Sequence, residues 1–169
     1  MAGAAMALVA AAATPLFAQE SASQCAAPAT PEGALAPWAD QVSVITGADR
    51  PSAGVPAIEP GRTMQMTLHP AAAMQYPATP GKAGDTGYGG LATVDIQEAG
   101  TFRVALGSGA WVDLVSDGNA VESIAHGHGP ECSGIRKMVD FKLEAGTHTL
   151  QIAGNGEAET KVLVVRLPS

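Results

Sequence analysis

Charged and aromatic side chains are both scarce in this chain of 169 residues, at 15% and 4% of the sequence. Basic residues are the rarest charged class, with 9 Lys and Arg against 16 Asp and Glu, so the formal net charge is −7. No Lys or Arg precedes Arg50. Phosphate backbones and anionic membrane surfaces are bound by basic faces, so this balance argues against nucleic acid or a lipid surface as partner.

Helical periodicity is also missing after residue 18, while 20 Gly and 12 Pro favour turns over long helices. Apolar and polar residues instead alternate with the period of two that is typical of half-buried strands. About nine short strands at this spacing predict an all-β fold, an antiparallel β-sandwich of the jelly-roll kind over residues 41–169. We expect the strands at 42–46, 63–68, 91–96, 102–106, 110–115, 121–125, 139–143, 148–152 and 161–167.

One short motif occurs twice. Glu-Ala-Gly-Thr stands at residues 98–101 and again at 144–147, and an alternating strand follows each copy. Glycine permits a positive φ in a turn, and threonine favours the start of a strand. The repetition predicts a recurring β-turn-β device.

The N-terminus is expected to direct export. Residues 6–13 are an unbroken apolar run, Pro15 follows, and Ala18 ends a small-residue cleavage site. These features predict a signal peptide at 1–18 and a periplasmic or secreted protein. The run is too short to span a bilayer. The alternative for residues 1–18 is an Ala-rich disordered tail. Residues 19–40, which are rich in Ala and Pro, are expected to form an extended arm or linker.

The chain has 2 cysteines, Cys25 and Cys132. An even number in an exported protein predicts a disulfide between them. The loop that it closes would exceed about 100 residues, for which the chain-entropy model gives about 4–5 kcal/mol of stabilisation. The alternative is a free Cys132 that binds a metal beside His126 and His128.

Residues 125–137 hold the densest set of chemically active side chains. His126, His128 and Glu131 offer two imidazoles and a carboxylate, a set that suits zinc, copper or iron, with His69 as a possible further ligand. The same residues are equally compatible with a Gly/Pro loop whose histidines face solvent or cap backbone groups. Both interpretations stay open at this point.

Two other features bear on ligand binding. Arg136 and Lys137 form a positive pair that could hold an anionic ligand or, alternatively, pair with a nearby carboxylate. Trp111 lies within an expected strand, which favours the core over an exposed stacking surface. Met64 and Met66 alternate with polar residues, so they are expected in the core rather than at a copper site.

The segments EAGTFRVAL, WVDLVSDGNAV and FKLEAGTHTLQIAG resemble pre-peptidase C-terminal domains. Those are small jelly-roll sandwiches appended to secreted bacterial enzymes. The resemblance covers less than half of the chain. It implies a sandwich fold and an extracellular location, and it carries no catalytic residue.

The segments GSGAWVDLV, AHGHGPECSGIRKMVDF and LQIAGN are similar to a group of short exported bacterial proteins that often bear the label homogentisate 1,2-dioxygenase. The dioxygenase of that name holds ferrous iron with histidines and a glutamate. This second resemblance therefore implies His126, His128 and Glu131 as the candidate iron ligands.

Two functions follow as expectations. The first is a periplasmic or secreted binding or structural module without catalysis, whose small ligand or cell-envelope partner meets residues 125–137. The second is a small metal-dependent enzyme, a non-haem iron dioxygenase acting on an aromatic such as homogentisate.

Overall fold

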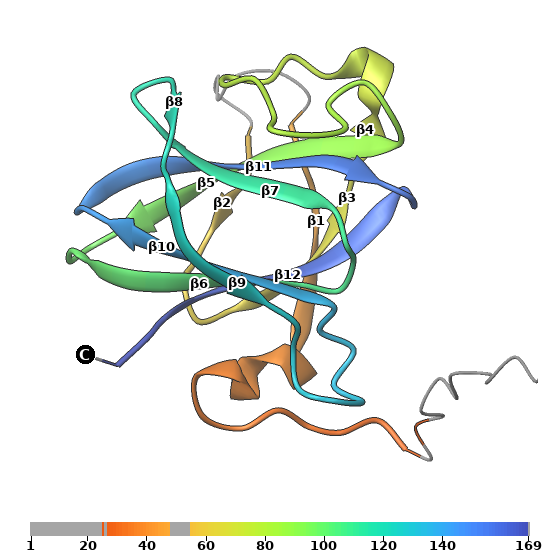
Figure 1. Ribbon diagram of the computed structural model, residues 1–169, viewed down its shortest axis with the longest axis vertical. Helices are drawn as coiled ribbons and strands as arrows, with labels where there is room; N and C mark the ends of the chain where they lie inside the picture. The colour runs from red at the N-terminus through yellow and green to blue at the C-terminus, as the bar shows by residue number, and fades with distance from the viewer. Residues whose placement is uncertain (1–24, 26, 48–54, 169) are drawn as a thin grey trace, which may run out of the picture.

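The computed structural model describes Cys25, residues 27–47 and residues 55–168, and the expected signal peptide at 1–18 lies outside these residues. The described chain forms two six-stranded sheets that pack face to face (Figure 1). The predicted all-β sandwich is therefore confirmed. Its strands are β1 (Gln41–Ile45), β2 (Ala57–Ile58), β3 (Thr63–Thr67), β4 (His69–Pro70), β5 (Tyr88–Ile96), β6 (Gly100–Leu106), β7 (Trp111–Ser116), β8 (Asn119–Ala120), β9 (Ser123–Gly127), β10 (Lys137–Leu143), β11 (Gly146–Asn155) and β12 (Glu159–Arg166).

The two sheets have simple strand orders. Sheet A runs β1-β3-β12-β6-β10-β9, and sheet B runs β2-β5-β11-β7-β8 with β4 beside β5. Every expected strand overlaps an observed one, and the strands that alternation did not indicate, β2, β4 and β8, have two residues each. Two strand pairs, β1 with β3 and β2 with β5, are parallel, so the sheets are mixed rather than purely antiparallel.

The inner faces of the two sheets form the main core. Alternate residues of each central strand point inward and are almost fully buried, as the period of two requires. Met64 and Met66 belong to this core, as expected. The largest completely enclosed side chains include Leu106, Leu114, Phe141, Leu150 and Ile152.

The repeated Glu-Ala-Gly-Thr motif forms two arches between the sheets. The first copy carries the chain from β5 in sheet B to β6 in sheet A, and the second carries it from β10 in sheet A to β11 in sheet B. The arches lie beside each other, because Gly100 pairs with Leu143 in one sheet and Gly146 pairs with Ile96 in the other. Gly146 has φ 139°, a backbone conformation that residues with a side chain rarely adopt.

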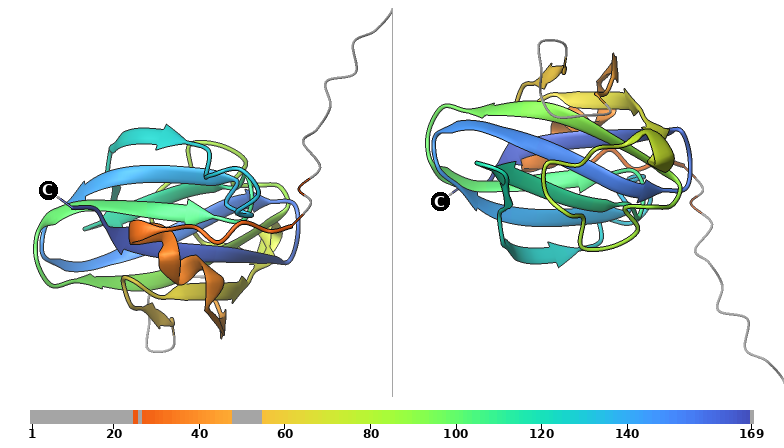
Figure 2. Two further views of the ribbon diagram at one scale, coloured as in Figure 1. Left: turned by 90° about the horizontal axis from the view of Figure 1, so that it is seen from below. Right: turned by 90° about the horizontal axis from the view of Figure 1, so that it is seen from above.

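A second hydrophobic layer covers the outer face of sheet A. Within the expected arm, residues Gly33–Ala39 form a 3-10 helix, η1, which lies beside sheet A (Figures 1 and 2). Its Leu35 and Trp38 pack on the sheet. Ile135, from the loop between β9 and β10, joins the same cluster. The other members of this layer are Ala105, Leu163 and Val165.

The outer face of sheet B is covered as well. The segment 71–87, which includes the short 3-10 helix η2 (Ala71–Ala73), crosses it above β11 (Figure 1). The amide of Ala78 donates a hydrogen bond of 3.3 Å to the side chain of Gln151 on β11. A Cβ on Gly81 would lie 2.3 Å from the ring of Trp111, so glycine permits the close approach there. As a result Gln151 is completely buried although it is polar.

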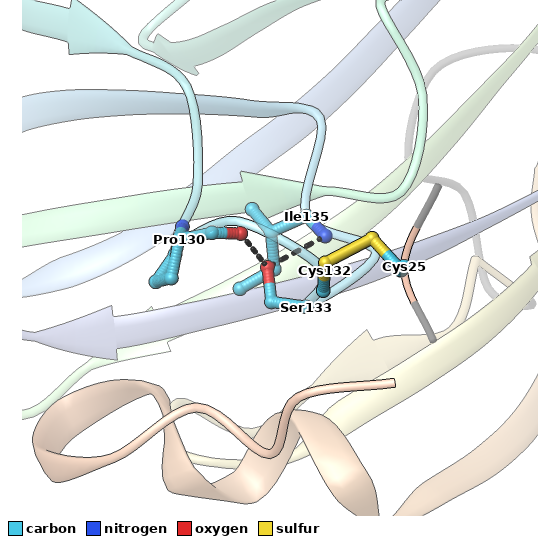
Figure 3. The surroundings of a disulfide bond; sticks show 5 residues. All are labelled: Cys25, Pro130, Cys132, Ser133 and Ile135. Atoms are coloured by element: carbon cyan, nitrogen blue, oxygen red, sulfur yellow. Dashed lines mark hydrogen bonds between the residues drawn. A yellow bond between two sulfur atoms is a disulfide. The ribbon is translucent and has the colours of Figure 1, made fainter. Parts of the chain in front are cut away.

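The Cys25–Cys132 disulfide joins the arm to the loop between β9 and β10 (Figure 3). The prediction of this bond is confirmed, and it rules out Cys132 as a free metal ligand. Backbone and side-chain hydrogen bonds reinforce the junction, from Ala29 N to Cys132 O at 2.8 Å and from Trp38 Nε1 to Ser133 O at 2.9 Å.

Removing the disulfide should destabilise the protein, because the bond closes a loop with a sequence separation of 107 residues. We expect the double variant Cys25→Ser, Cys132→Ser to lose about 2–5 kcal/mol of unfolding free energy. Urea unfolding of the variant, and of the wild type with and without reductant, measures the loss. An unchanged urea midpoint in both comparisons would contradict the role of this bond.

Candidate functional site

The loop that carries the expected metal ligands has a well-defined structural task. Ser133 Oγ donates to Pro130 O at 2.6 Å and accepts from the amide of Ile135 at 3.1 Å, so the turn is hydrogen-bonded internally (Figure 3). His128 Nδ1 donates across the loop to the carbonyl of Arg136 at 3.0 Å. The loop thus presents Ile135 to the outer face of sheet A and holds the arm there.

The expected metal ligands are not brought together. His126 lies on β9 opposite Val139, while the ring of His128 bonds within the loop and Glu131 is exposed near its tip. His69 lies on sheet B, where its Nε2 donates to Thr46 O at 2.7 Å. In the described part of the chain, no group of three His, Cys, Asp or Glu side chains could hold a metal ion. These residues therefore do not fit the iron site that the resemblance implies.

A pocket of about 420 Å³ opens at one edge of the sandwich, between β7 and β8 of sheet B and β9 and β10 of sheet A. We call it the edge pocket. Val112, Val139 and Phe141 belong to the main core and form its apolar floor. The other residues that line it are Trp111, Asp113, Ala120, Val121, Glu122, Ser123, His126 and Lys137.

The edge pocket exists because the sandwich is not closed on this side. The Asp117-Gly118 turn has φ values of 49° and 81°, the combination of a tight hairpin, but the returning strand β8 is only two residues long. The chain then crosses from sheet B to the edge of sheet A as β9 (Figure 1). Ser123 and His126 of β9 are exposed at this opening, and Val112, Val139 and Phe141 lie beneath it, each no more than 5% exposed.

Lys137 is the cationic side chain that lines the edge pocket. It has the inward orientation of Val139 and Phe141 on β10, and its Nζ donates to the carbonyl of Ala110 at 2.9 Å. The same ammonium lies 5.2 Å from the centroid of the Trp111 ring, within the range of a cation–π contact. Burial lowers the pKa of Lys137, and the charge of Asp113 opposes that shift.

Asp113 fixes the position of Trp111. The indole Nε1 lies 2.9 Å from both carboxylate oxygens of Asp113, and Gln151 Nε2 donates to one of them at 2.9 Å. Burial raises the pKa of Asp113, and these hydrogen bonds and Lys137 partly offset the shift. The acid therefore uses its acceptors within the protein and holds the ring at the pocket wall.

The sequence did not indicate this arrangement. Trp111 was expected in the core, but it points to the outer side of β7 and is only half-buried, while Val112 and Leu114 face inward. The spacing Trp-x-Asp places both side chains on one face of a strand, which is the only local signal. Gln151 becomes their neighbour through the pairing of β11 with β7, and Lys137 through the packing of the two sheets.

The positive pair of Arg136 and Lys137 is divided between two sites. Lys137 lines the edge pocket, whereas Arg136 is exposed and lines a separate, open hollow of about 570 Å³ together with Trp38 and Lys161. Lys161 Nζ lies 4.9 Å from the Trp38 ring and donates to Trp38 O. That hollow therefore borders the junction that holds the arm.

The chain matches no known family model, and no curated protein has significant similarity to it. The two resemblances stated above stay predictions. Among the described residues, no helix has both the length and the apolar character needed to cross a membrane.

The burial of Lys137 predicts a pH effect on stability. A lysine with a lowered pKa binds fewer protons in the native than in the unfolded state, so its contribution to stability rises with pH up to its ordinary value near 10.5. We expect the melting temperature of wild type, relative to Lys137→Met, to rise as pH increases towards that value. Lys142→Met, exposed on the same strand, removes the same charge outside the pocket. An equal pH effect in both variants would contradict the assignment.

Proposed function

We propose that this protein is a periplasmic or secreted, non-catalytic binding module that takes a small ligand in the edge pocket. The observation that carries the proposal is the opening of about 420 Å³ onto the core floor, with Trp111 and Lys137 beside it. Small-molecule sites of this size are concave, mainly apolar and equipped with a few placed polar groups. The edge pocket has each of these properties.

The location of the polar groups also supports binding over catalysis. Asp113 is hydrogen-bonded to Trp111 and Gln151, and the ring of His128 is bonded to a backbone carbonyl outside the pocket. These side chains hold the structure in place. The dioxygenase alternative requires converging iron ligands, and the described His126, His128 and Glu131 do not converge.

The proposed location rests on two observations. The disulfide is typical of oxidising compartments, and residues 1–18 have the composition of a signal peptide.

Export has a direct test. Expressed in a bacterial host with its own N-terminus, the mature protein should be recovered outside the cytoplasm and begin at or near Gln19. N-terminal sequencing of the recovered protein identifies the first residue. Recovery of a cytoplasmic protein that retains Met1 would contradict the proposed location.

Ligand binding can be tested by filling the edge pocket. Ser123 lines its mouth on β9, so Ser123→Phe should block it, whereas Ser43→Phe makes the same change on β1 at the opposite edge of sheet A. Tryptophan fluorescence, titrated with octanoate, octan-1-ol and octylamine, reports the binding, since Trp111 lines the edge pocket and Trp38 does not. We expect saturable binding of at least one probe, weakened about tenfold or more by Ser123→Phe and unchanged by Ser43→Phe.

The two serine variants also define the result that would contradict the proposal. If none of the three probes binds saturably to the wild type, the edge pocket is not a binding site for small amphiphiles. If Ser43→Phe and Ser123→Phe weaken binding equally, the probes bind elsewhere. Far-UV circular dichroism of both variants establishes that each keeps the β-sandwich.

A further inference from the structure

The edge pocket has an asymmetry between its hydrogen-bond donors and acceptors. An ammonium has three N–H donors, and the bond from Lys137 Nζ to Ala110 O uses one of them. At the mouth, Ser123 and His126 offer further polar groups from the exposed strand β9. The cation is thus placed inside the pocket with donors to spare, above an apolar floor.

The acids of the pocket are arranged differently. Asp113 is 8% exposed, and both of its oxygens accept hydrogen bonds from the protein itself, since the indole N–H of Trp111 is shared between them and Gln151 donates to one. Glu122 is exposed at the rim, where water screens its charge. In the described chain neither acid forms a salt bridge with Lys137, although the charge of Asp113 acts on its ammonium. A ligand that complements this pocket must therefore bring acceptors of its own.

The floor sets the second requirement. Val112, Val139 and Phe141 lie at the bottom of the pocket but are only 4%, 5% and 1% exposed, so most of the apolar surface that a ligand can cover belongs to half-buried Trp111 and Val121. An alkyl or aromatic group that enters the pocket is itself removed from water, and the free energy gained grows with the apolar area buried. A small inorganic anion would leave the floor uncovered and would also meet the net charge of −7 of the whole protein. The apolar part of the ligand must supply the affinity that long-range electrostatics does not.

We propose that the edge pocket binds an amphipathic organic anion, with a carboxylate at Lys137 and an alkyl or aromatic group on the floor formed by Val112, Val139 and Phe141. This inference rests on the proposed binding function and adds the chemical class of the ligand. The carboxylate accepts the free N–H donors of the ammonium as charge-assisted hydrogen bonds. Trp111, held by Asp113, forms the wall against which the apolar group packs.

The probe series described above tests the charge requirement at constant chain length. At pH 7 the wild type should bind octanoate about tenfold or more tightly than octan-1-ol, and octylamine should bind weakest. Extending the chain from hexanoate to octanoate should strengthen binding about fourfold for each added methylene, since each methylene that enters the pocket is removed from water. Isothermal titration calorimetry and tryptophan fluorescence measure both comparisons.

Lysine variants identify the group that recognises the charge. Lys137→Met should weaken octanoate binding about tenfold or more and leave octan-1-ol binding within about twofold, which removes the preference for the anion. Lys142→Met, exposed and outside the pocket, should preserve that preference. Should Lys137→Met fail to fold, the comparison of the three probes on the wild type still decides whether the pocket prefers an anion.

The outcomes separate this inference from the proposed function. Saturable, pocket-dependent binding in which octan-1-ol or octylamine equals or exceeds octanoate would overturn the anion preference and leave the binding function standing. An octanoate preference that survives in Lys137→Met would overturn the assignment of Lys137. The absence of saturable binding by every probe would overturn both proposals.

Discussion

The alternation of side chains along β10 is the constraint on which both layers of the protein depend. Val139, Phe141 and Leu143 point inward and complete the main core, whereas Asp140 points outward, where Arg103 on β6 binds it with two hydrogen bonds of 2.7 and 2.8 Å. Asp140 and Arg103 are direct cross-strand partners, so this ion pair fixes the register of the two strands. A slip by one residue would exchange the two faces, bury the acid in the core and expel Phe141.

The same register explains why the loop between β9 and β10 stabilises the fold instead of forming a metal site. Because β10 begins at Lys137, the preceding residues turn back over the outer face of sheet A, where Ile135 packs against Leu35 and Trp38. The disulfide and the bond from Trp38 to Ser133 hold the arm on this surface. The loop covers apolar surface of sheet A, and its histidines remain at its edges.

Most strands of the sandwich could be predicted from the sequence, because apolar and polar residues alternate wherever one side of a strand faces the core. Phe102, Val104 and Leu106 are an example. The edge pocket could not be predicted from the sequence, because Trp111 and Lys137 lie on strands of different sheets that only the folded chain brings together. On sheet B, alternation identifies Leu150 and Ile152 as the inward-facing residues of β11, but it does not indicate the burial of polar Gln151, because segment 71–87 covers the outer face there.

Lys137 is a charged residue in the inward-facing row of β10, and its side chain lines the edge pocket. Its neighbours in the inward-facing row of β10 are apolar, and burial lowers its pKa, so the charged form is less stable here than in water. A methionine would cover the floor without that penalty. Positions where a sequence departs from what local packing favours are where function is expected. In the proposed complex, a bound carboxylate would return the pKa of the lysine towards its ordinary value, as the charge of Asp113 already does in part.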